Sequence, residues 1–207
     1  MKTFLFCLIS VVLGVCCMGK HSTLNEKRRV KEVFLKENVK IVIPLKEEAF
    51  SDSNTYSHIE IWIDSQIVFS DTSTTEYLFD NKNWPQARKV KNGEYEILIE
   101  MFNAPDFNKL QSWYFKNYLL IKMKVFPFFD KAPEDIDNDG IKEYSGVMHI
   151  ADAYENSDSC YYNPTLYYKI TNQGIDLDST LTIRMNKKIW GEFNGFEQSE
   201  KLLPCSK

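Results

Sequence analysis

Residues 58–70 read HIEIWIDSQIVFS, and this stretch decides the fold class. Every second residue from 59 to 63 is isoleucine, and this period of two is typical of a half-buried β-strand. The polar residues 64–66 are predicted to form a tight turn into a second apolar run at 67–69. The stretch therefore predicts a β-hairpin.

Similar strand patterns recur along most of the chain. They are VKIVIPL at 39–45, EYEILIEMF at 94–102, NYLLIKMKVFPFF at 117–129, YSGVMHIADAY at 144–154 and a hairpin within 165–185. Alternate residues from Leu119 to Val125 are predicted to share one face of their strand. Asn92-Gly93 and Asn172-Gln173-Gly174 are turn signals, and residues 70–92 indicate a long loop that includes one short strand candidate, EYLF at 76–79. No helical stripe exceeds two turns beyond the N-terminal signal helix. We therefore predict a mainly β fold, a single antiparallel β domain arranged as a sandwich, a meander or a partly open barrel.

The bulk composition excludes two classes of protein. The chain has 207 residues, of which 43% are hydrophobic and 26% charged, a balance that excludes disorder of the whole chain. The formal net charge of −4 argues against nucleic-acid binding, which requires a basic face.

Residues 1–19 have the layout of a secretory signal: a lysine, an apolar stretch from 4 to 15, then small residues and cysteines. The apolar stretch is short for a membrane span, which needs ~20 residues. LGVCC resembles the lipobox of bacterial lipoproteins, which implies lipidation at Cys16 or Cys17. Ordinary secretion, with cleavage after Gly19 for instance, is the alternative. Either route predicts an exported protein with a polar linker at 20–37 and a β-rich domain at 38–207.

Two cysteines, Cys160 and Cys205, remain outside the signal region. Outside the cytoplasm two cysteines usually pair, so a Cys160–Cys205 disulfide is predicted. Such a bridge would contribute ~3–4 kcal/mol in the chain-entropy model. Two separate buried thiols are the alternative.

Residues 135–146 read DIDNDGIKEYSG, with acidic residues at every second position before a glycine. Alternate carboxylates on a curled loop converge on one point, and a hard divalent ion takes six to eight oxygen ligands. Without a cation, four carboxylates so close together would repel one another. The spacing predicts a structural calcium site at 135–143 with five ligand residues: Asp135, Asp137, Asp139, Ile141 through its carbonyl, and Glu143.

The loop differs from an EF-hand, because position 12 is Gly146 instead of a glutamate and the flanks are strand-like. It resembles instead the D-x-D-x-D-G-x-x-D/E loops of FG-GAP-type repeats, as in integrin β-propellers. The resemblance covers about twelve residues and occurs once, so it implies the same ligand set but no propeller. A solvated acidic β-turn is the alternative interpretation.

Catalytic motifs are absent from the sequence, so no catalytic residue is predicted and the protein is not expected to be an enzyme. The acidic pair Asp176 and Asp178 has no glycine in register and indicates an exposed strand edge. His58 and His149 lie in strand candidates and are expected to be structural. Exposed tryptophans could stack on sugars, but core positions are favoured for all four, Trp62, Trp84, Trp113 and Trp190.

The segment 135–193, in which the acidic loop is followed by a tyrosine-rich hairpin, resembles the C-terminal half of small secreted bacterial β proteins. Some relatives of that type are lysozyme inhibitors or immunity proteins of the cell envelope. The resemblance implies a lipid-anchored envelope protein that binds another protein, either a hydrolase or a toxin. A surface glycan-binding or glycan-processing protein is the alternative, and a purely structural envelope protein is a third.

Overall fold

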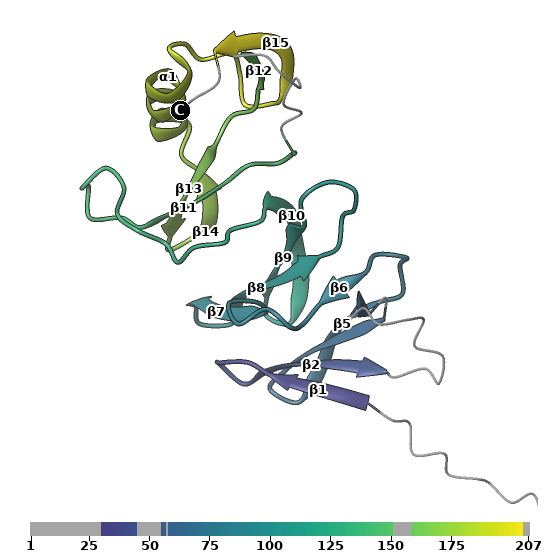
Figure 1. Ribbon diagram of the computed structural model, residues 1–207. Helices are drawn as coiled ribbons and strands as arrows, with labels where there is room; N and C mark the ends of the chain where they lie inside the picture. Colours follow the sequence, from purple (N-terminus) through teal and green to yellow (C-terminus); the bar gives the residue numbers. More distant parts are fainter. Residues whose placement is uncertain (1–29, 45–54, 57, 151–158, 205–207) are drawn as a thin grey trace, which may run out of the picture.

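A computed structural model describes residues 30–44, 55–56, 58–150 and 159–204 (Figure 1). Within these residues the chain forms fifteen β-strands and one α-helix. The predicted signal segment 1–19, the candidate lipidation residues Cys16 and Cys17, and Cys205 lie outside the described residues.

The first antiparallel sheet contains the alternating stretch 59–63. Its strands, in spatial order, are β1 (Val30–Phe34), β2 (Val39–Pro44), β4 (Ile59–Ile63) and β5 (Gln66–Asp71). Asp64 and Ser65 both have positive φ, 47° and 67°, and join β4 to β5 in a two-residue turn. Such turns match the twist of paired strands, and the hairpin predicted at 58–70 is confirmed.

The second antiparallel sheet forms the middle layer of the molecule (Figure 1). Its strands, in spatial order, are β10 (Leu119–Pro127), β9 (Lys109–Lys116), β8 (Glu94–Met101), β6 (Tyr77–Leu78) and β3 (Thr55–Tyr56), and β7 (Gln86–Lys91) pairs with β8. Six consecutive residues of β8, 95–100, are buried. A strand is buried at every position only when both faces of its sheet are covered.

The C-terminal region covers the other face of the second sheet. It contains the three-stranded sheet β11 (Glu143–Gly146), β13 (Leu166–Thr171) and β14 (Gly174–Leu177), the helix α1 (Ser179–Trp190), and the pair β12 (Ser159–Tyr162) and β15 (Ser199–Pro204). These elements lie at the top of Figure 1, with the first sheet at the bottom. The acidic loop 135–143 is part of this region.

Two hydrophobic cores lie on opposite faces of the second sheet. The isoleucine core, between the two large sheets, comprises Val39, Ile41, Ile43, Ile59, Ile61, Ile63, Tyr77, Tyr95, Ile97, Ile99, Trp113 and Phe115. The aromatic core, towards the C-terminal region, comprises Trp84, Leu98, Leu110, Phe126, Phe129, Tyr144, Leu166, Tyr168 and Ile175. Ile97 and Leu98 are neighbours in β8 yet belong to different cores, as the period of two in a strand requires.

The prediction of a mainly β fold is confirmed. The described sheets are antiparallel and open, in an arrangement that fits a sandwich or meander, and none of them closes into a barrel. Among the described residues, no helix combines the length and the apolar character needed to cross a membrane.

The predicted linker at 20–37 extends too far, because strand β1 occupies Val30–Phe34. Val33 packs against the isoleucine core, whereas Phe34 is exposed. Only one face of this edge strand is covered, so its composition is polar enough to suggest a linker.

Helix α1 and four further strands, β7, β9, β12 and β15, were not predicted from the sequence. Helix α1 contradicts the expectation of no helix longer than two turns. Its most buried side chains include the polar residues Thr182 and Asn186, so the apolar stripe that marks a helix is broken. Strand β7 lies inside the predicted loop 70–92, and its sequence QARKVK lacks a clear apolar alternation.

Strand β10 departs from the predicted alternation because of a β-bulge near Ile121. The register shifts between Leu120 and Lys122, so Leu120 lies opposite Phe115 and Met123 opposite Trp113. Because Phe115 and Trp113 both belong to the isoleucine core, these β10 residues share a face although they are three positions apart. The prediction that Leu119 to Val125 share one face is therefore wrong for part of the strand.

Candidate metal centre

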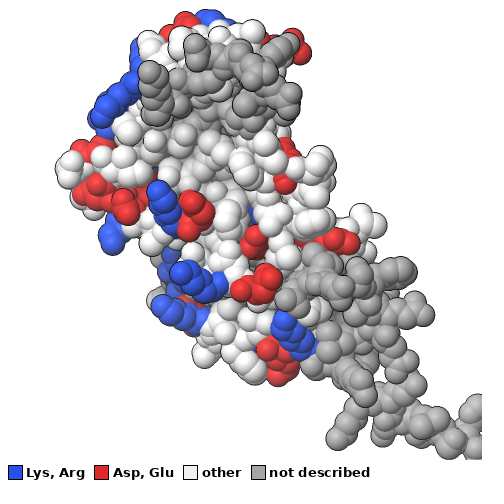
Figure 2. All heavy atoms as spheres, viewed as in Figure 1, with Lys and Arg blue, Asp and Glu red and all other residues white. Residues whose placement is uncertain are grey.

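The acidic loop is closed by a short antiparallel bridge between Glu134 and Glu143. The backbone nitrogen of each residue donates to the carbonyl of the other, at 3.0 Å and 2.8 Å. The loop thus begins and ends at a fixed point, at the first residue of β11. Acidic side chains gather at this side of the molecule (Figure 2).

Three of the four predicted carboxylates converge inside the loop. Asp135, Asp137 and Glu143 each offer a carboxylate oxygen, and these oxygens lie within 4.8 Å of one another. Asp135 is exposed, Asp137 is partly buried and Glu143 is only 2% exposed. These three residues, which we call the acidic triad, can hold a metal ion.

Backbone nitrogens inside the loop fix the orientation of the carboxylates. Asp135 accepts from the nitrogens of Asp139 and Gly140, at 3.1 Å and 3.0 Å. Glu143 Oε2 accepts from the nitrogen of Ile136 at 3.0 Å. Gly140 has φ of 86°, a left-handed conformation that glycine adopts without a steric penalty. The positive φ at position 140 therefore explains why the loop pattern has a glycine there.

The triad has the electrostatics of a site crowded with negative charge. Burial raises the pKa of Glu143, and the nearby carboxylates of Asp137, Asp139 and Asp135 raise it further, against the opposing hydrogen bond from Ile136. Oδ1 of Asp137 is buried and has no hydrogen-bond partner among the described residues. Buried carboxylate oxygens are normally paired with a donor or a cation.

The structure does not place the other two predicted ligand residues in the triad. Oδ1 of Asp139 accepts from the nitrogen of Ile141 at 2.7 Å, so this carboxylate stabilises the turn. Ile141 is exposed. Their roles as ligands, through the Asp139 carboxylate and the Ile141 carbonyl, stay predictions.

One residue that contacts the acidic triad, Arg184, was not predicted from the sequence. Arg184 of helix α1 donates from Nη2 to Oδ2 of Asp137 at 3.0 Å. It lies 47 positions from Asp137, in a helix that the apolar pattern does not reveal. Neither hydrophobic periodicity nor motif spacing links two residues so far apart in the chain, so the sequence does not predict this pair.

Helix α1 is held in place by buried polar contacts with β13. Thr182 Oγ1 accepts from the nitrogen of Tyr167 at 3.1 Å. The side chain of Asn186 accepts from the nitrogen of Thr165 at 3.0 Å and donates to its carbonyl at 2.7 Å. These contacts fix the helix, and with it Arg184, beside the acidic loop.

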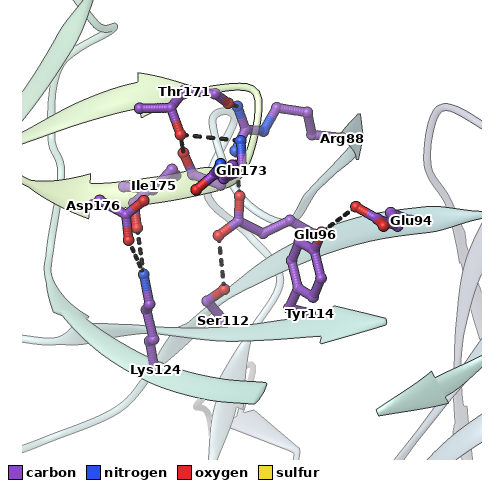
Figure 3. Close-up of polar contacts among 11 residues, drawn as sticks. Arg88, Glu94, Glu96, Ser112, Tyr114, Lys124, Thr171, Gln173, Ile175 and Asp176 are labelled. Atoms are coloured by element: carbon purple, nitrogen blue, oxygen red, sulfur yellow. Dashed lines mark hydrogen bonds and ion pairs between the residues drawn. The ribbon is translucent and has the colours of Figure 1, made fainter. Parts of the chain in front are cut away.

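The β13–β14 hairpin is anchored to the second sheet by a polar contact surface (Figure 3). Arg88 forms a salt bridge with the buried Glu96, and its Nη1 donates to the carbonyl of Thr171 at 3.2 Å. Ser112 donates to Glu96 at 3.2 Å. Lys124 Nζ lies 2.6 Å from the carbonyl of Ile175 and 2.6 Å from Asp176 Oδ1. Because β13 also pairs with β11, which carries Glu143, this surface positions the acidic triad relative to the central layer.

Two of the four tryptophans are fully buried. Trp113 lies in the isoleucine core and Trp84 in the aromatic core, as favoured from the sequence. Trp62 and Trp190 are partly buried, and Trp190 packs edge-on against Tyr162 at 5.6 Å between ring centroids.

The acidic pair Asp176 and Asp178, also considered in the sequence, takes part in contacts that hold the fold together. Asp176 pairs with Lys124, and Asp178 caps helix α1 by accepting from the nitrogen of Leu181 at 2.8 Å. Cys160 lies in β12, opposite Leu203 of β15. Its predicted partner Cys205 is outside the described residues, so the disulfide stays a prediction.

The chain matches no protein-family model, no curated protein and no solved structure. Function must therefore be argued from its own residues.

Proposed function

We propose that residues 135–143 bind a calcium ion that stabilises the C-terminal region of an exported binding protein. The observation that carries the calcium site is the acidic triad, in which a buried oxygen of Asp137 has no partner among the described residues. An oxygen-only ligand set favours a hard cation such as Ca²⁺. In the proposed site, Asp139 and the carbonyl of Ile141 complete the ligand set.

The loop geometry supports this choice over a solvated acidic turn. An acidic turn in solvent directs its carboxylates to water, whereas Glu143 is almost completely buried at the base of the loop. A cation would balance the charge that raises the pKa of Glu143. Arg184 supplies only one positive charge, at one oxygen of Asp137.

Thermal unfolding in millimolar calcium and in chelator tests the site. An ion that binds only the folded state stabilises it, by about 2.7 kcal/mol at a hundredfold excess over Kd. We expect a higher Tm in calcium, and expect Glu143→Gln to remove the difference. Asp130→Asn, an exposed carboxylate outside the triad, serves as the matched control and should retain it. An identical Tm of the unmodified protein in both buffers would contradict the proposal.

Two further variants test whether Asp139 is a ligand, as the motif implies, and what Arg184 does at the triad. If Asp139 is a ligand, as the FG-GAP-type register implies, Asp139→Asn should weaken calcium binding, as measured by calorimetric titration. If Arg184 competes with the ion for Asp137, Arg184→Gln should strengthen it. The reverse result for Arg184 would show that this side chain supports the bound state.

The binding function is proposed to be directed at a protein of the cell envelope, a hydrolase or a toxin. Strand β10 supports a protein partner, because its apolar residues Ile121 and Met123 are 58% and 52% exposed. Exposed apolar side chains that cluster on one element are typical of protein contact surfaces. Export and lipidation at Cys16 or Cys17 remain part of the proposal, and a Cys16→Ala, Cys17→Ala double variant should leave the membrane fraction.

Affinity capture from a cell-envelope extract tests the partner. A specific partner should be retained by the unmodified protein and lost with the Ile121→Ser, Met123→Ser double variant. Phe34→Ser, which changes an exposed apolar residue of β1 instead, should retain it. Equal capture by all three proteins, or none, would contradict a protein contact at β10.

A further inference from the structure

A polar hollow of about 450 Å³ lies in the C-terminal region. Among the described residues it is lined by His149, Tyr161, Glu197, Gln198, Ser199 and Glu200, none of which belongs to the acidic triad. His149 follows β11, Tyr161 belongs to β12 and Ser199 begins β15, so three separate segments meet at the hollow. A volume of this size is within the range of small-molecule sites.

The imidazole of His149 is held in a defined state by Asp106. His149 Nδ1 lies 2.6 Å from Asp106 Oδ2, while Asp106 Oδ1 accepts from the nitrogens of Ile150 and Phe107, at 2.7 Å and 2.9 Å. Burial alone would raise the pKa of Asp106, but the hydrogen bonds from Ile150, His149 and Phe107 outweigh it and lower the pKa. An ionised carboxylate only accepts, so Nδ1 donates. Any ligand that bonds to the ring must therefore do so at Nε2.

The backbone of His149 is fixed as well. Its carbonyl accepts from Nδ2 of Asn163 at 2.7 Å, and Asn163 is a buried residue directly after β12. The position of the ring is thus set by contacts on both its side chain and its main chain. Such support on two sides is what a preorganised binding residue requires.

Ser199 supplies a second, independent observation. Its Oγ is buried and has no hydrogen-bond partner in the described part of the chain, yet the residue lines the hollow. Buried hydroxyl groups are nearly always paired with protein or with a ligand or water. A ligand in the hollow could pair with this hydroxyl after a rotation about χ1 of Ser199.

We infer that this hollow binds a small polyhydroxylated ligand, a saccharide unit. Two carboxylates, Glu197 and Glu200, accept hydrogen bonds, and Gln198 both donates and accepts. Neighbouring hydroxyl groups of a sugar both donate and accept hydrogen bonds, and the aromatic ring of Tyr161 offers a surface for sugar C–H groups. This inference goes beyond the calcium site and the protein partner, and it does not depend on either.

A titration of the full, isotope-labelled protein by NMR tests the inference. The probes are a panel of neutral mono- to tetrasaccharides, including N-acetylated sugars, and spermidine in a separate arm. We expect at least one saccharide to shift the amide signals of residues 149, 161 and 197–200. Ser199→Ala and Glu197→Gln should each weaken that binding about tenfold, the effect of losing one hydrogen bond to a charged or buried group.

Two controls accompany this titration, a variant outside the hollow and a test of folding. Glu76→Gln, an exposed carboxylate of the second-sheet region, should bind like the unmodified protein, and thermal melting must show that each variant is folded. No shift with any saccharide would overturn the inference. Shifts with spermidine alone would also overturn it, because they would show that the two carboxylates attract a cation and the hollow does not recognise hydroxyl groups.

Discussion

The isoleucine core and the aromatic core lie on opposite faces of one sheet, yet they are built from different sequence patterns. The isoleucine core draws on strands that alternate regularly, such as β4 with Ile59, Ile61 and Ile63. The aromatic core combines residues from loops and strands far apart in sequence, such as Trp84 and Phe129 from loops and Tyr144 from β11. Polar contacts such as the Arg88–Glu96 salt bridge lie beside this core. Tyr144, one of its residues, directly follows Glu143 of the acidic loop.

This difference shows how one chain separates structural support from candidate function. Regular alternation gives the first sheet a face whose described core residues are all apolar. The C-terminal region instead contains the buried carboxylate Glu143, the salt bridge of Arg88 and the polar hollow. Buried polar groups stabilise a protein only when they are paired, so this region depends more on its electrostatic partners.

The largest expected effect comes from Trp113→Ala. This side chain is fully buried against Phe69 and Tyr77, with ring centroids 5.7 Å and 5.6 Å away. Loss of a buried tryptophan should lower the free energy of unfolding by about 3–5 kcal/mol. Trp62→Ala, at a partly exposed tryptophan of β4 outside the isoleucine core, is the control and should cost less.

The same variant tests whether the two cores unfold together. They share the second sheet, so denaturant unfolding followed by circular dichroism and by fluorescence should give a single coincident transition. Two separated transitions would show instead that the regions on either side of the sheet are independent units.

A smaller effect, about 2–3 kcal/mol, is expected for Arg88→Met. This change leaves Glu96 buried without its cation. The estimate lies below that for a fully buried pair because Arg88 is partly exposed. Hydrogen exchange should accelerate in the β13–β14 hairpin and not in β4. The control is Lys89→Met, an exposed neighbour; equal destabilisation by both variants would rule out the salt bridge as the cause.

Asp178→Ala should cost about 1 kcal/mol, the usual contribution of a helix N-cap. Its carboxylate accepts from the nitrogen of Leu181 at the start of α1. Thr180→Ala, within the first turn but exposed, is the control, and urea unfolding is the measurement. A calcium affinity that changes in the same direction in Asp178→Ala and in Arg184→Gln would link the helix position to the acidic loop through Arg184.

The smallest expected change is a pH dependence that is specific to the C-terminal region. Burial first, and then neighbouring carboxylates, raise the pKa of Glu143 above its usual 4.5. The folded state therefore keeps this proton to higher pH than the unfolded state does, and its contribution to stability is lost as pH rises from about 4.5 through the raised pKa.

Urea unfolding over a pH series in chelator measures this dependence. The decrease should disappear in Glu143→Gln and should be reversed by calcium, which favours the ionised form. A decrease that persists unchanged in Glu143→Gln would assign it to another group.

The predictable part of this protein is the part with regular alternation. Residues 59–63 and 94–102 were recognised as strands because one face, or both, is consistently apolar. Strand β7 and helix α1 were missed because tertiary contacts, such as those of Asn186 with Thr165, replace the apolar pattern. Local sequence carries no record of such contacts.

The candidate site shows the same division. The spacing of residues 135–143 is local, so the convergence of Asp135, Asp137 and Glu143 could be anticipated from the sequence. Arg184, His149 with Asp106, and the buried Ser199 reach their sites through the fold. His149 is 43 positions from Asp106, and Arg184 is 47 positions from Asp137.

The bulge in β10 has a consequence for the protein at high concentration. A flat edge strand with several exposed apolar residues is a template for stacking copies of the same chain into aggregates. In β10 the extra residue near Ile121 interrupts the regular ladder, and the exposed Lys122 adds a charge at the same point. Both are devices by which natural proteins keep sheet edges from joining. Deletion of Ile121 together with Lys122→Ile should therefore make copies of the chain more prone to join into fibres.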